Sequence, residues 1–177
     1  QSADTSCCVK HYALNNQELD RKKVNAELSD RALREIYLPG FKAAADAGAG
    51  SFMGAYNRYK GQHCCHNEYL VNDILKGEWG WDGVYLSDWA GVHDTVESAK
   101  YGLDIEMGTQ VEGANYNEYF LGDAFEELCK QDEEYVKLLD ESGVIELIFV
   151  AEHHSVVLLF VVGAAKKILQ KGDVAAV

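Results

Sequence analysis

Hydrophobic and polar residues alternate in the middle of the chain, over residues 83–89, and this pattern predicts a short β-strand. Val84 and Leu86 are its apolar positions, and Asp88 and Trp89 follow directly. Side chains at the C-terminal ends of parallel strands form the functional edge of α/β sheets and barrels. We therefore expect the chain to be organised around this strand and the carboxylate that ends it.

The same pattern recurs on both sides of this segment, with helical spacing between the apolar runs. Short runs that end in polar side chains predict further strands at residues 7–12, 51–57 and 103–107. Helices are predicted over residues 30–47, 67–75 and 93–101, the second capped by Asn67. Strands and helices that alternate in this way indicate a parallel sheet covered by helices. The polar strand ends indicate an α/β fold that is part of a (β/α)8 TIM-like barrel, about four βα units of it.

A long polar loop and a helix fill the segment between the first two predicted strands. Residues 13–28 are rich in Asn, Gln and charge, and long loops after a strand commonly carry function. Ser29 is a good N-cap for the helix that follows. Leu33, Ile36 and Tyr37 are predicted to share one face of that helix.

After residue 108 the pattern predicts helical segments instead of further strands. Residues 116–129 and 135–140 have amphipathic helical spacing. The apolar run at residues 155–165 is too short to span a bilayer, so a buried helix or strand is expected. The predicted divisions are a partial barrel at residues 1–108, its helical end at 109–143, and an apolar tail or the start of a linker or second domain at 144–177.

The charge of the chain narrows the possible partners. The sequence carries 29 acidic and 16 basic residues, a formal net charge of −13. An acidic surface repels phosphate, so neither nucleic acid nor an anionic membrane is an expected partner. The first residues are polar and do not resemble a signal peptide, and no initiator Met is present. We expect the chain to begin inside a longer protein, and no cellular compartment is assigned.

The five cysteines do not have the spacing of a zinc site or a redox C-x-x-C motif. Cys7 and Cys8 lie in a predicted strand and are expected to be small buried hydrophobic residues. Cys64 and Cys65 lie between two histidines, but four consecutive ligands rarely close on one ion, and no metal site is predicted. A disulfide within or between these pairs stays possible.

Five segments of the sequence together resemble the glycoside hydrolases of family 3. They are KHYALNNQE at residues 10–18, LREIYLP at 33–39, MGAYN at 53–57, SDWAGVH at 87–93 and GLDIEM at 102–107. The resemblance covers residues 1–108 and implies the C-terminal half of the family's catalytic barrel. The best-known members are β-glucosidases and β-xylosidases, so it implies an exo-acting β-glycosidase whose substrate is a β-glucoside or an oligosaccharide.

Asp88 matches the nucleophile of this family. The resemblance implies a retaining mechanism, in which Asp88 attacks the anomeric carbon and water later hydrolyses the covalent glycosyl-enzyme. The alternative from the residues alone is an Asp that only caps the following turn. The sequence context Ser87-Asp88-Trp89 favours catalysis.

Other residues match the family's sugar-binding positions. Lys10 and His11 match a pair that binds sugar hydroxyls, Tyr56 matches a tyrosine beside the nucleophile, and Trp89 matches the aromatic wall of the subsite. Met53 matches a pocket-lining position, although core packing explains a methionine there nearly as well. The mechanism implied by the family requires no cofactor and no metal.

Parts of the family's machinery are not identifiable in the sequence. The general acid/base and two sugar-binding residues of the first half of the barrel are among them, so the chain alone is expected to lack hydrolase activity. Its expected partners are the rest of its own barrel and a second domain, and exposed strand edges make a homo-oligomer possible. Asp104 and Glu106 are expected to be structural.

Two alternatives remain open. One is a non-catalytic, carbohydrate-binding relative of the family. The other is a barrel lyase that uses Lys10 as a Schiff base, because a lysine on a barrel strand is the nucleophile of class I aldolases.

Overall fold

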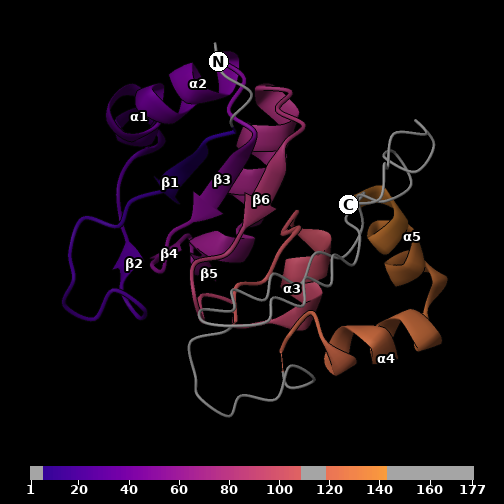
Figure 1. Cartoon of the computed structure of the whole chain (residues 1–177). Coiled ribbons are helices and arrows are strands. Elements are labelled where there is room, and N and C mark those ends of the chain that lie inside the picture. Colours follow the sequence, from indigo (N-terminus) through magenta and orange to yellow (C-terminus); the bar gives the residue numbers. More distant parts are fainter. Residues whose placement is uncertain (1–5, 109–118, 143–177) are drawn as a thin grey trace, which may run out of the picture.

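A computed structural model describes residues 6–108 and 119–142 of the chain (Figure 1). Within these residues, strands form two three-stranded sheets. The strands are β1 Cys8–Tyr12, β2 Asn25–Ala26, β3 Ser51–Gly54, β4 Arg58–Tyr59, β5 Gln62–His63 and β6 Val84–Leu86. The helical segments are α1 Asp30–Ala32, the π-helical η1 Leu33–Tyr37, α2 Pro39–Asp46, the 3-10 turn η2 Cys64–His66, the π-helical η3 Tyr69–Glu78, α3 Thr95–Lys100, α4 Asp123–Gln131 and α5 Glu133–Ser142.

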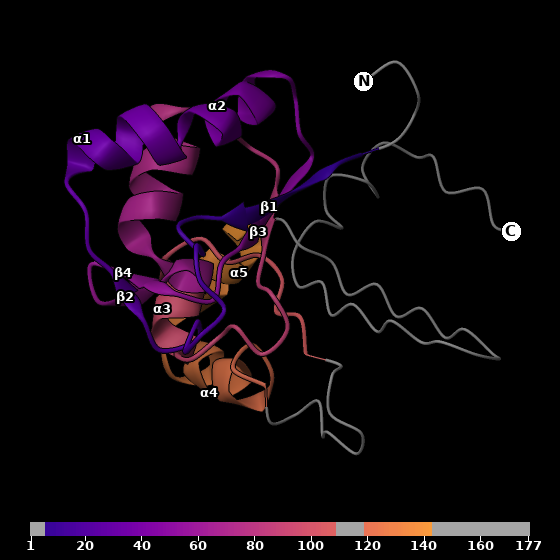
Figure 2. The same ribbon diagram turned by 90° about the vertical axis from the view of Figure 1, so that its left-hand side faces the viewer.

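The larger sheet has the order β1-β3-β6, and its strands are parallel. Figure 1 shows these strands side by side, and in both views α1 and α2 lie on one side of them and α4 on the opposite side (Figures 1 and 2). Successive strands are joined by helical segments, as the alternation of periods predicts for a parallel α/β sheet. The expected α/β class and parallel strands are therefore confirmed, and the barrel of about four units stays a prediction.

The fourth expected strand, at residues 103–107, forms a single parallel bridge between Leu86 and Ile105. Near this bridge, side-chain oxygens accept from backbone N–H groups that would bond to backbone carbonyls in a longer strand pair. Asp104 Oδ2 accepts from the Tyr85 N–H at 2.7 Å, and Ser87 Oγ accepts from the Met107 N–H at 2.9 Å. This segment thus lies along β6 without being a regular strand beyond the bridge.

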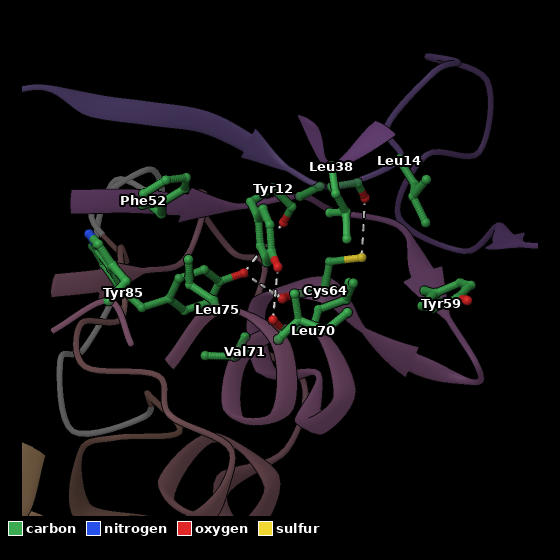
Figure 3. Packing of buried hydrophobic residues seen from close by; sticks show 14 of the residues in the cluster. Tyr12, Leu14, Leu38, Phe52, Tyr59, Cys64, Leu70, Val71, Leu75 and Tyr85 are labelled. Carbon is green, nitrogen blue, oxygen red and sulfur yellow. Dashed lines mark hydrogen bonds between the residues drawn. The ribbon is translucent and has the colours of Figure 1, made fainter. Parts of the chain in front are cut away.

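The face of the sheet beneath the helices holds the main hydrophobic core. Tyr12, Phe52 and Tyr85, one from each strand, pack against Leu70 and Leu75 of η3 (Figure 3). The ring centroids of Tyr12 and Phe52 are 5.8 Å apart in an edge-to-face arrangement, which suits the aromatic quadrupoles. The Tyr12 hydroxyl donates to the Leu70 carbonyl at 2.8 Å, so this buried polar atom is satisfied and joins β1 to η3.

The opposite face of the sheet carries a smaller apolar cluster. Met53 and Leu86 are neighbours in register on β3 and β6, and they pack with Ile105 and Met107. Lys10 is the register partner of Met53 on β1. This second face of the sheet therefore carries Lys10 at the edge strand β1 and, at its other end, the apolar cluster against which Trp89 packs.

The helix after the long loop begins as predicted but turns differently. Ser29 Oγ accepts from the Ala32 N–H at 3.2 Å, which confirms the N-cap. Leu33 is fully buried, whereas Ile36 is 71% exposed, so the expected common face of these two residues is wrong. The reason is the π-helical turn at residues 33–37. Its wider i→i+5 hydrogen bonding rotates Ile36 away from the face on which Leu33 lies.

The expected burial of Cys7 and Cys8 is also wrong, because both thiols are exposed. In the described residues β1 pairs with β3 only, so its other edge is uncovered and its first residues lie at the surface. The buried thiols are instead those of Cys64 and Cys65, and no disulfide joins the five cysteines.

The smaller sheet has the order β2-β4-β5, and it continues beyond the C-terminal end of β3 (Figure 1). Lys60 and Gly61 connect β4 to β5 with positive φ angles of 53° and 87°, the combination that a two-residue type I′ hairpin requires. The sequence pattern did not predict this hairpin, because each of its strands has only two residues.

The C-terminal part of the described chain is helical, as expected. In α4 and α5 the rings of Phe125 and Tyr135 pack edge-to-face, with centroids 6.4 Å apart. No helix among the described residues is long and apolar enough to cross a membrane. The apolar run expected at residues 155–165 lies outside the described residues, as does the whole predicted division at 144–177.

Candidate active site

Asp88 lies two residues beyond the end of β6 and is 7% exposed. Its Oδ1 accepts from the Trp89 N–H at 2.8 Å, and its carbonyl accepts from the Gly91 N–H at 3.0 Å, which closes a tight turn. The turn-capping interpretation is therefore correct for Oδ1. Oδ2 faces other side chains instead. The oxygen that caps the turn is therefore not the one available for a reaction.

His11 contacts Asp88 from β1, the strand at the other edge of the sheet from β6. Its Nε2 lies 3.2 Å from Asp88 Oδ2. The register between β1 and β3 shifts between Lys10 and Tyr12, so that His11 is an extra residue in its strand. Such a bulge re-aims a side chain and is common beside active sites. The bulge allows an imidazole from β1 to contact a carboxylate that follows β6.

Tyr56 is the third member of this group. Its side chain is buried, and burial raises its pKa to about 12, with the charge of Asp88 and a hydrogen bond to that carboxylate as further causes. At neutral pH the phenol is therefore protonated and can donate to Asp88. The structure thus brings together three of the residues singled out in the sequence: Asp88, His11 and Tyr56.

Arg21 and Lys22 on the long loop contact this group and were not singled out in the sequence. The Arg21 guanidinium carbon lies 4.5 Å from the centroid of the Tyr56 ring, and the Lys22 Nζ lies 5.0 Å from it. Arg21 also pairs with Glu18 at 2.8 Å. In the sequence, only the position of a long charged loop directly after a strand pointed to these residues. Such a position indicates a functional loop but does not predict which of its side chains contact the site.

The remaining sugar-binding candidates line the same region less closely. Met53 is buried in the small apolar cluster, and Trp89 packs against that cluster while partly exposed. Lys10 is exposed beside Met53 in register. The structure therefore places Met53 and Trp89 together and leaves Lys10 on the same face at the edge strand.

The segment His63–His66 distributes its side chains among different partners. His63 Nδ1 lies 3.1 Å from the Tyr56 carbonyl, and His66 Nδ1 lies 2.9 Å from Glu97 Oε2. Cys64 Sγ and Cys65 Sγ donate to backbone carbonyls, and burial raises the pKa of Cys64 to about 12. No group of three or more potential metal ligands among the described residues could hold an ion.

Asp104 and Glu106 have structural partners. Lys76 Nζ lies 3.2 Å from both carboxylate oxygens of Asp104, which also accepts the Tyr85 N–H. Glu106 Oε2 accepts from the Leu121 N–H at 2.8 Å and so fixes the approach to α4. Burial raises the pKa of both carboxyl groups.

Fold and site together define an α/β protein in which a buried carboxylate, a buried phenol and a partly exposed imidazole meet at the carboxyl edge of a parallel sheet, the edge used by barrel and doubly wound enzymes. The chain belongs to glycosyl hydrolase family 3, since the sequence model of the Glycosyl hydrolase family 3 N terminal domain matches residues 1–111.

Curated relatives match the chain as well, and one of them matches more of it than the family model does. The chain is 48% identical over 158 residues to the β-glucosidase BoGH3A of Bacteroides ovatus, a match that covers 84% of the chain and 21% of the relative. It is 45% identical over 108 residues to an exo-α-(1→6)-L-arabinopyranosidase of Bifidobacterium longum, over 60% of the chain and 14% of the relative. The chain thus spans about a fifth or less of the length of these relatives.

Solved structures match about three quarters of the chain. β-Glucosidase 3B of Thermotoga neapolitana, solved with glycerol, aligns with a TM-score of 0.69 at 38% identity, covering 76% of the chain and 19% of the neighbour. The β-D-glucoside glucohydrolase of Trichoderma reesei aligns with a TM-score of 0.71 at 31% identity, covering 77% and 19%. DesR of Streptomyces venezuelae, solved with D-glucose, aligns with a TM-score of 0.66 at 34% identity, covering 78% and 20%.

Proposed function

We propose that this chain carries the nucleophile-bearing part of a retaining, exo-acting β-glycosidase that removes terminal β-D-glucosyl or β-D-xylosyl residues. The single observation that carries the proposal is the buried carboxylate of Asp88 after β6, within 3.2 Å of His11 Nε2. A carboxylate held rigidly, with one oxygen fixed by a backbone N–H, is preorganised to attack a bound carbon atom.

In this reaction Asp88 forms a bond to the anomeric carbon while the glycosidic C–O bond breaks. The departing oxygen takes a proton from a general acid, and the glycosyl-aspartate is then hydrolysed by water, which that same residue deprotonates. The two carboxyl groups of a retaining enzyme stand about 5 Å apart across the bond. In the described residues the neighbouring carboxylates Asp104 and Glu106 are engaged in structural bonds, so the proton donor is proposed to come from another segment of the complete protein.

His11 and Tyr56 would serve both the nucleophile and the sugar. A neutral Tyr56 donates to Asp88, and His11 offers a donor or an acceptor to a sugar hydroxyl. Trp89 would present its ring to the C–H face of the sugar, and Met53 would line the pocket. Lys10, exposed on the same face, would donate to a hydroxyl when the pocket is complete.

We propose that residues 1–108 form about four βα units of the family's (β/α)8 barrel, its C-terminal half, and that residues 109–143 form its helical end. The parallel order β1-β3-β6, with Ile105 bridged to Leu86, supports this arrangement. The uncovered edge of β1 would then pair with the preceding part of the barrel, as unpaired strand edges require a partner.

The test uses the complete protein that contains this sequence. The protein is treated with one of three reagents: an aryl 2-deoxy-2-fluoro-β-glucoside, the corresponding β-xyloside or the corresponding α-arabinopyranoside. Mass spectrometry of the digested protein should find the label on the peptide that contains Asp88, and Asp88→Asn should abolish it. Label on another carboxylate overturns the assignment, and the preferred reagent reports the sugar. Tight binding of glucose without labelling would favour the non-catalytic relative, and borohydride trapping of an imine on Lys10 would favour the lyase.

The 177-residue chain alone is predicted to hydrolyse no aryl β-glucoside. Appreciable turnover by the isolated chain, lost in Asp88→Asn, would contradict the proposal that the acid/base lies elsewhere. It would leave the role of Asp88 intact.

A further inference from the structure

Three histidines outside the proposed sugar-binding set meet beside it, two from the segment at residues 63–66 and one from the loop after Asp88. His63 ends β5, His66 ends η2, and His93 follows the turn after Asp88. The rings of His63 and His93 stack, with centroids 3.9 Å apart and an angle of 27° between their planes. The backbone N–H of His93 donates to His66 Nε2 at 3.2 Å. The loop after Asp88 is therefore held by two imidazoles of the segment that follows Tyr56.

The hydrogen bonds assign the proton on two of these rings. His66 Nε2 accepts from a backbone N–H, so the ring proton of neutral His66 is on Nδ1, which faces Glu97 Oε2 at 2.9 Å. His63 Nδ1 faces the Tyr56 carbonyl at 3.1 Å, and a carbonyl only accepts, so His63 donates through Nδ1. Both nitrogens of His66 are thus occupied by protein partners.

These contacts form a continuous tie between Tyr56 and the loop that carries Asp88. The Tyr56 carbonyl accepts from the His63 ring, and His66 of the same segment joins it to the loop by accepting from the His93 N–H. The stack of His63 on His93 is an additional contact between the two segments. Tyr56 and Asp88 meet at the other ends of the same two segments. A shift of either segment would change the contact between the phenol and the carboxylate.

Burial favours the neutral rings on which the tie depends. The side chain of His66 is 1% exposed, and burial lowers its pKa to about 4. Burial also lowers the pKa of His63. The charged groups around the three rings are Arg58 and Lys22, whose positive charges oppose protonation, and Glu97 and Asp94 at the start of α3, which favour it.

We infer that His63 is a positioning residue: by holding the Tyr56 carbonyl through its Nδ1–H, it sets the contact between the Tyr56 hydroxyl and the Asp88 carboxylate, while His66 keeps the two segments joined through the His93 N–H. This inference deepens the proposed function and rests on it for the catalytic consequence. The positioning itself is a property of the fold and can be measured without substrate.

The donor of His63 can be removed separately from its ring. His63→Phe keeps a ring for the stack and loses the hydrogen bond to the Tyr56 carbonyl, whereas His63→Asn places an amide N–H near the position of Nδ1 and loses the stack. His93→Phe is the matched control, because it introduces the same side chain into the other half of the stack and leaves the backbone N–H to His66 in place.

The first measurement is the pKa of Tyr56 by NMR of tyrosine labelled with ¹³C at Cζ, assigned with Tyr56→Phe. In His63→Phe the pKa should fall below about 12, because the phenol moves away from Asp88, while the larger cause of the raised pKa, burial, remains. His63→Asn and His93→Phe should keep it near the parent value. An unchanged pKa in His63→Phe, or equal falls in His63→Phe and His63→Asn, would overturn the inference.

The second measurement is the rate at which Asp88 is labelled by the fluoro-glycoside, compared with the Kd for glucose. His63→Phe should slow labelling about tenfold with a much smaller change in Kd, His63→Asn should recover to within about threefold of the parent, and His93→Phe should also stay within about threefold. Equal effects on rate and Kd would overturn the inference. If the parent is never labelled, the proposed function fails while the Tyr56 titration still decides the positioning role.

Discussion

His11 Nε2 and Asp88 Oδ2 lie 3.2 Å apart, although they come from opposite edges of the three-stranded sheet. His11 lies in β1, and Asp88 follows β6. The intervening strand, β3, leads to Tyr56, so all three strands contribute one polar group to the same place. The predictions below concern this place and the contacts that support it.

Asp88→Asn should remove activity without unfolding the protein. Asparagine has nearly the same shape, and its oxygen can still accept from the Trp89 N–H. Glycoside hydrolysis by the longest chain that carries this sequence should fall by at least roughly a thousandfold, because the nucleophile is lost. The free energy of unfolding in urea should change by less than about 1 kcal/mol. Hydrolysis at the parent rate would contradict the assignment of Asp88.

Tyr56→Phe should slow the formation of the glycosyl-enzyme by about tenfold to a hundredfold, the value of a hydrogen bond to a charged group. Because the pKa of Tyr56 is about 12, its donor should persist across the whole range from neutral pH to pH 10. The ratio of parent to variant rates should therefore be constant over that range. Tyr37→Phe, which removes a hydroxyl that pairs with Asn16, is the control.

His66 should make the fold sensitive to acid. Its pKa is lowered from 6.5 to about 4, mainly by burial and also by His63, and the charge of Asp94 acts in the opposite direction. The stabilisation from its neutral ring is complete above pH 6.5 and is lost as the pH falls toward 4, by up to roughly 2 kcal/mol. Urea unfolding between pH 7 and 4.5 should show this decline, and His66→Gln should flatten it. An equally steep decline in the variant would assign the effect to other groups.

Asp104 should be important for stability, since Lys76 and the Tyr85 N–H both depend on it. Asp104→Ala leaves both donors without this partner and should lower the free energy of unfolding by about 3 kcal/mol. Asp104→Asn keeps an acceptor for Tyr85 and should cost less. Glu126→Gln, in an exposed i,i+4 pair with Lys130, should change stability by less than about 0.5 kcal/mol.

Gly54 should not tolerate a side chain. A Cβ there would lie 2.7 Å from the Cys65 backbone and 2.8 Å from the Tyr85 hydroxyl, so Gly54→Ala should destabilise the fold by about 1–3 kcal/mol. Gly40 in α2 has no atom within 4 Å of the same position, and Gly40→Ala should stabilise the protein by about 0.5–1 kcal/mol. Thermal unfolding of the two variants compares the same change at a crowded and an open site.

Local signals explain what the sequence predicted well. Ser29 caps its helix, and Asn67 Oδ1 accepts from the Leu70 N–H at 2.9 Å, because N-capping depends on residues only three apart. The strands around Val9, Phe52 and Tyr85 also follow from local alternation. Local pattern alone therefore predicts that Asp88 follows the end of a strand.

The features that the sequence did not predict depend on tertiary packing. Arg21 stacks on Tyr56 across a separation of 35 residues, and no period links a loop residue to the ring it covers. The stack of His63 on His93 likewise joins the short strand β5 to the loop after Asp88, and no sequence pattern links the two. Ile36 was placed on the wrong face because ideal α-helical spacing does not anticipate a π-helical turn.

The distribution of the cysteines has a practical consequence. Cys7 and Cys8 are exposed on the edge strand, while Cys64 and Cys65 are sealed beneath the site. A maleimide dye will therefore attach to the first pair and to the partly exposed Cys129 in the native protein, and Cys64 and Cys65 will react only when the structure around them opens. The molecule consequently carries its own reporter of local opening, readable by counting alkylated thiols without any engineered probe.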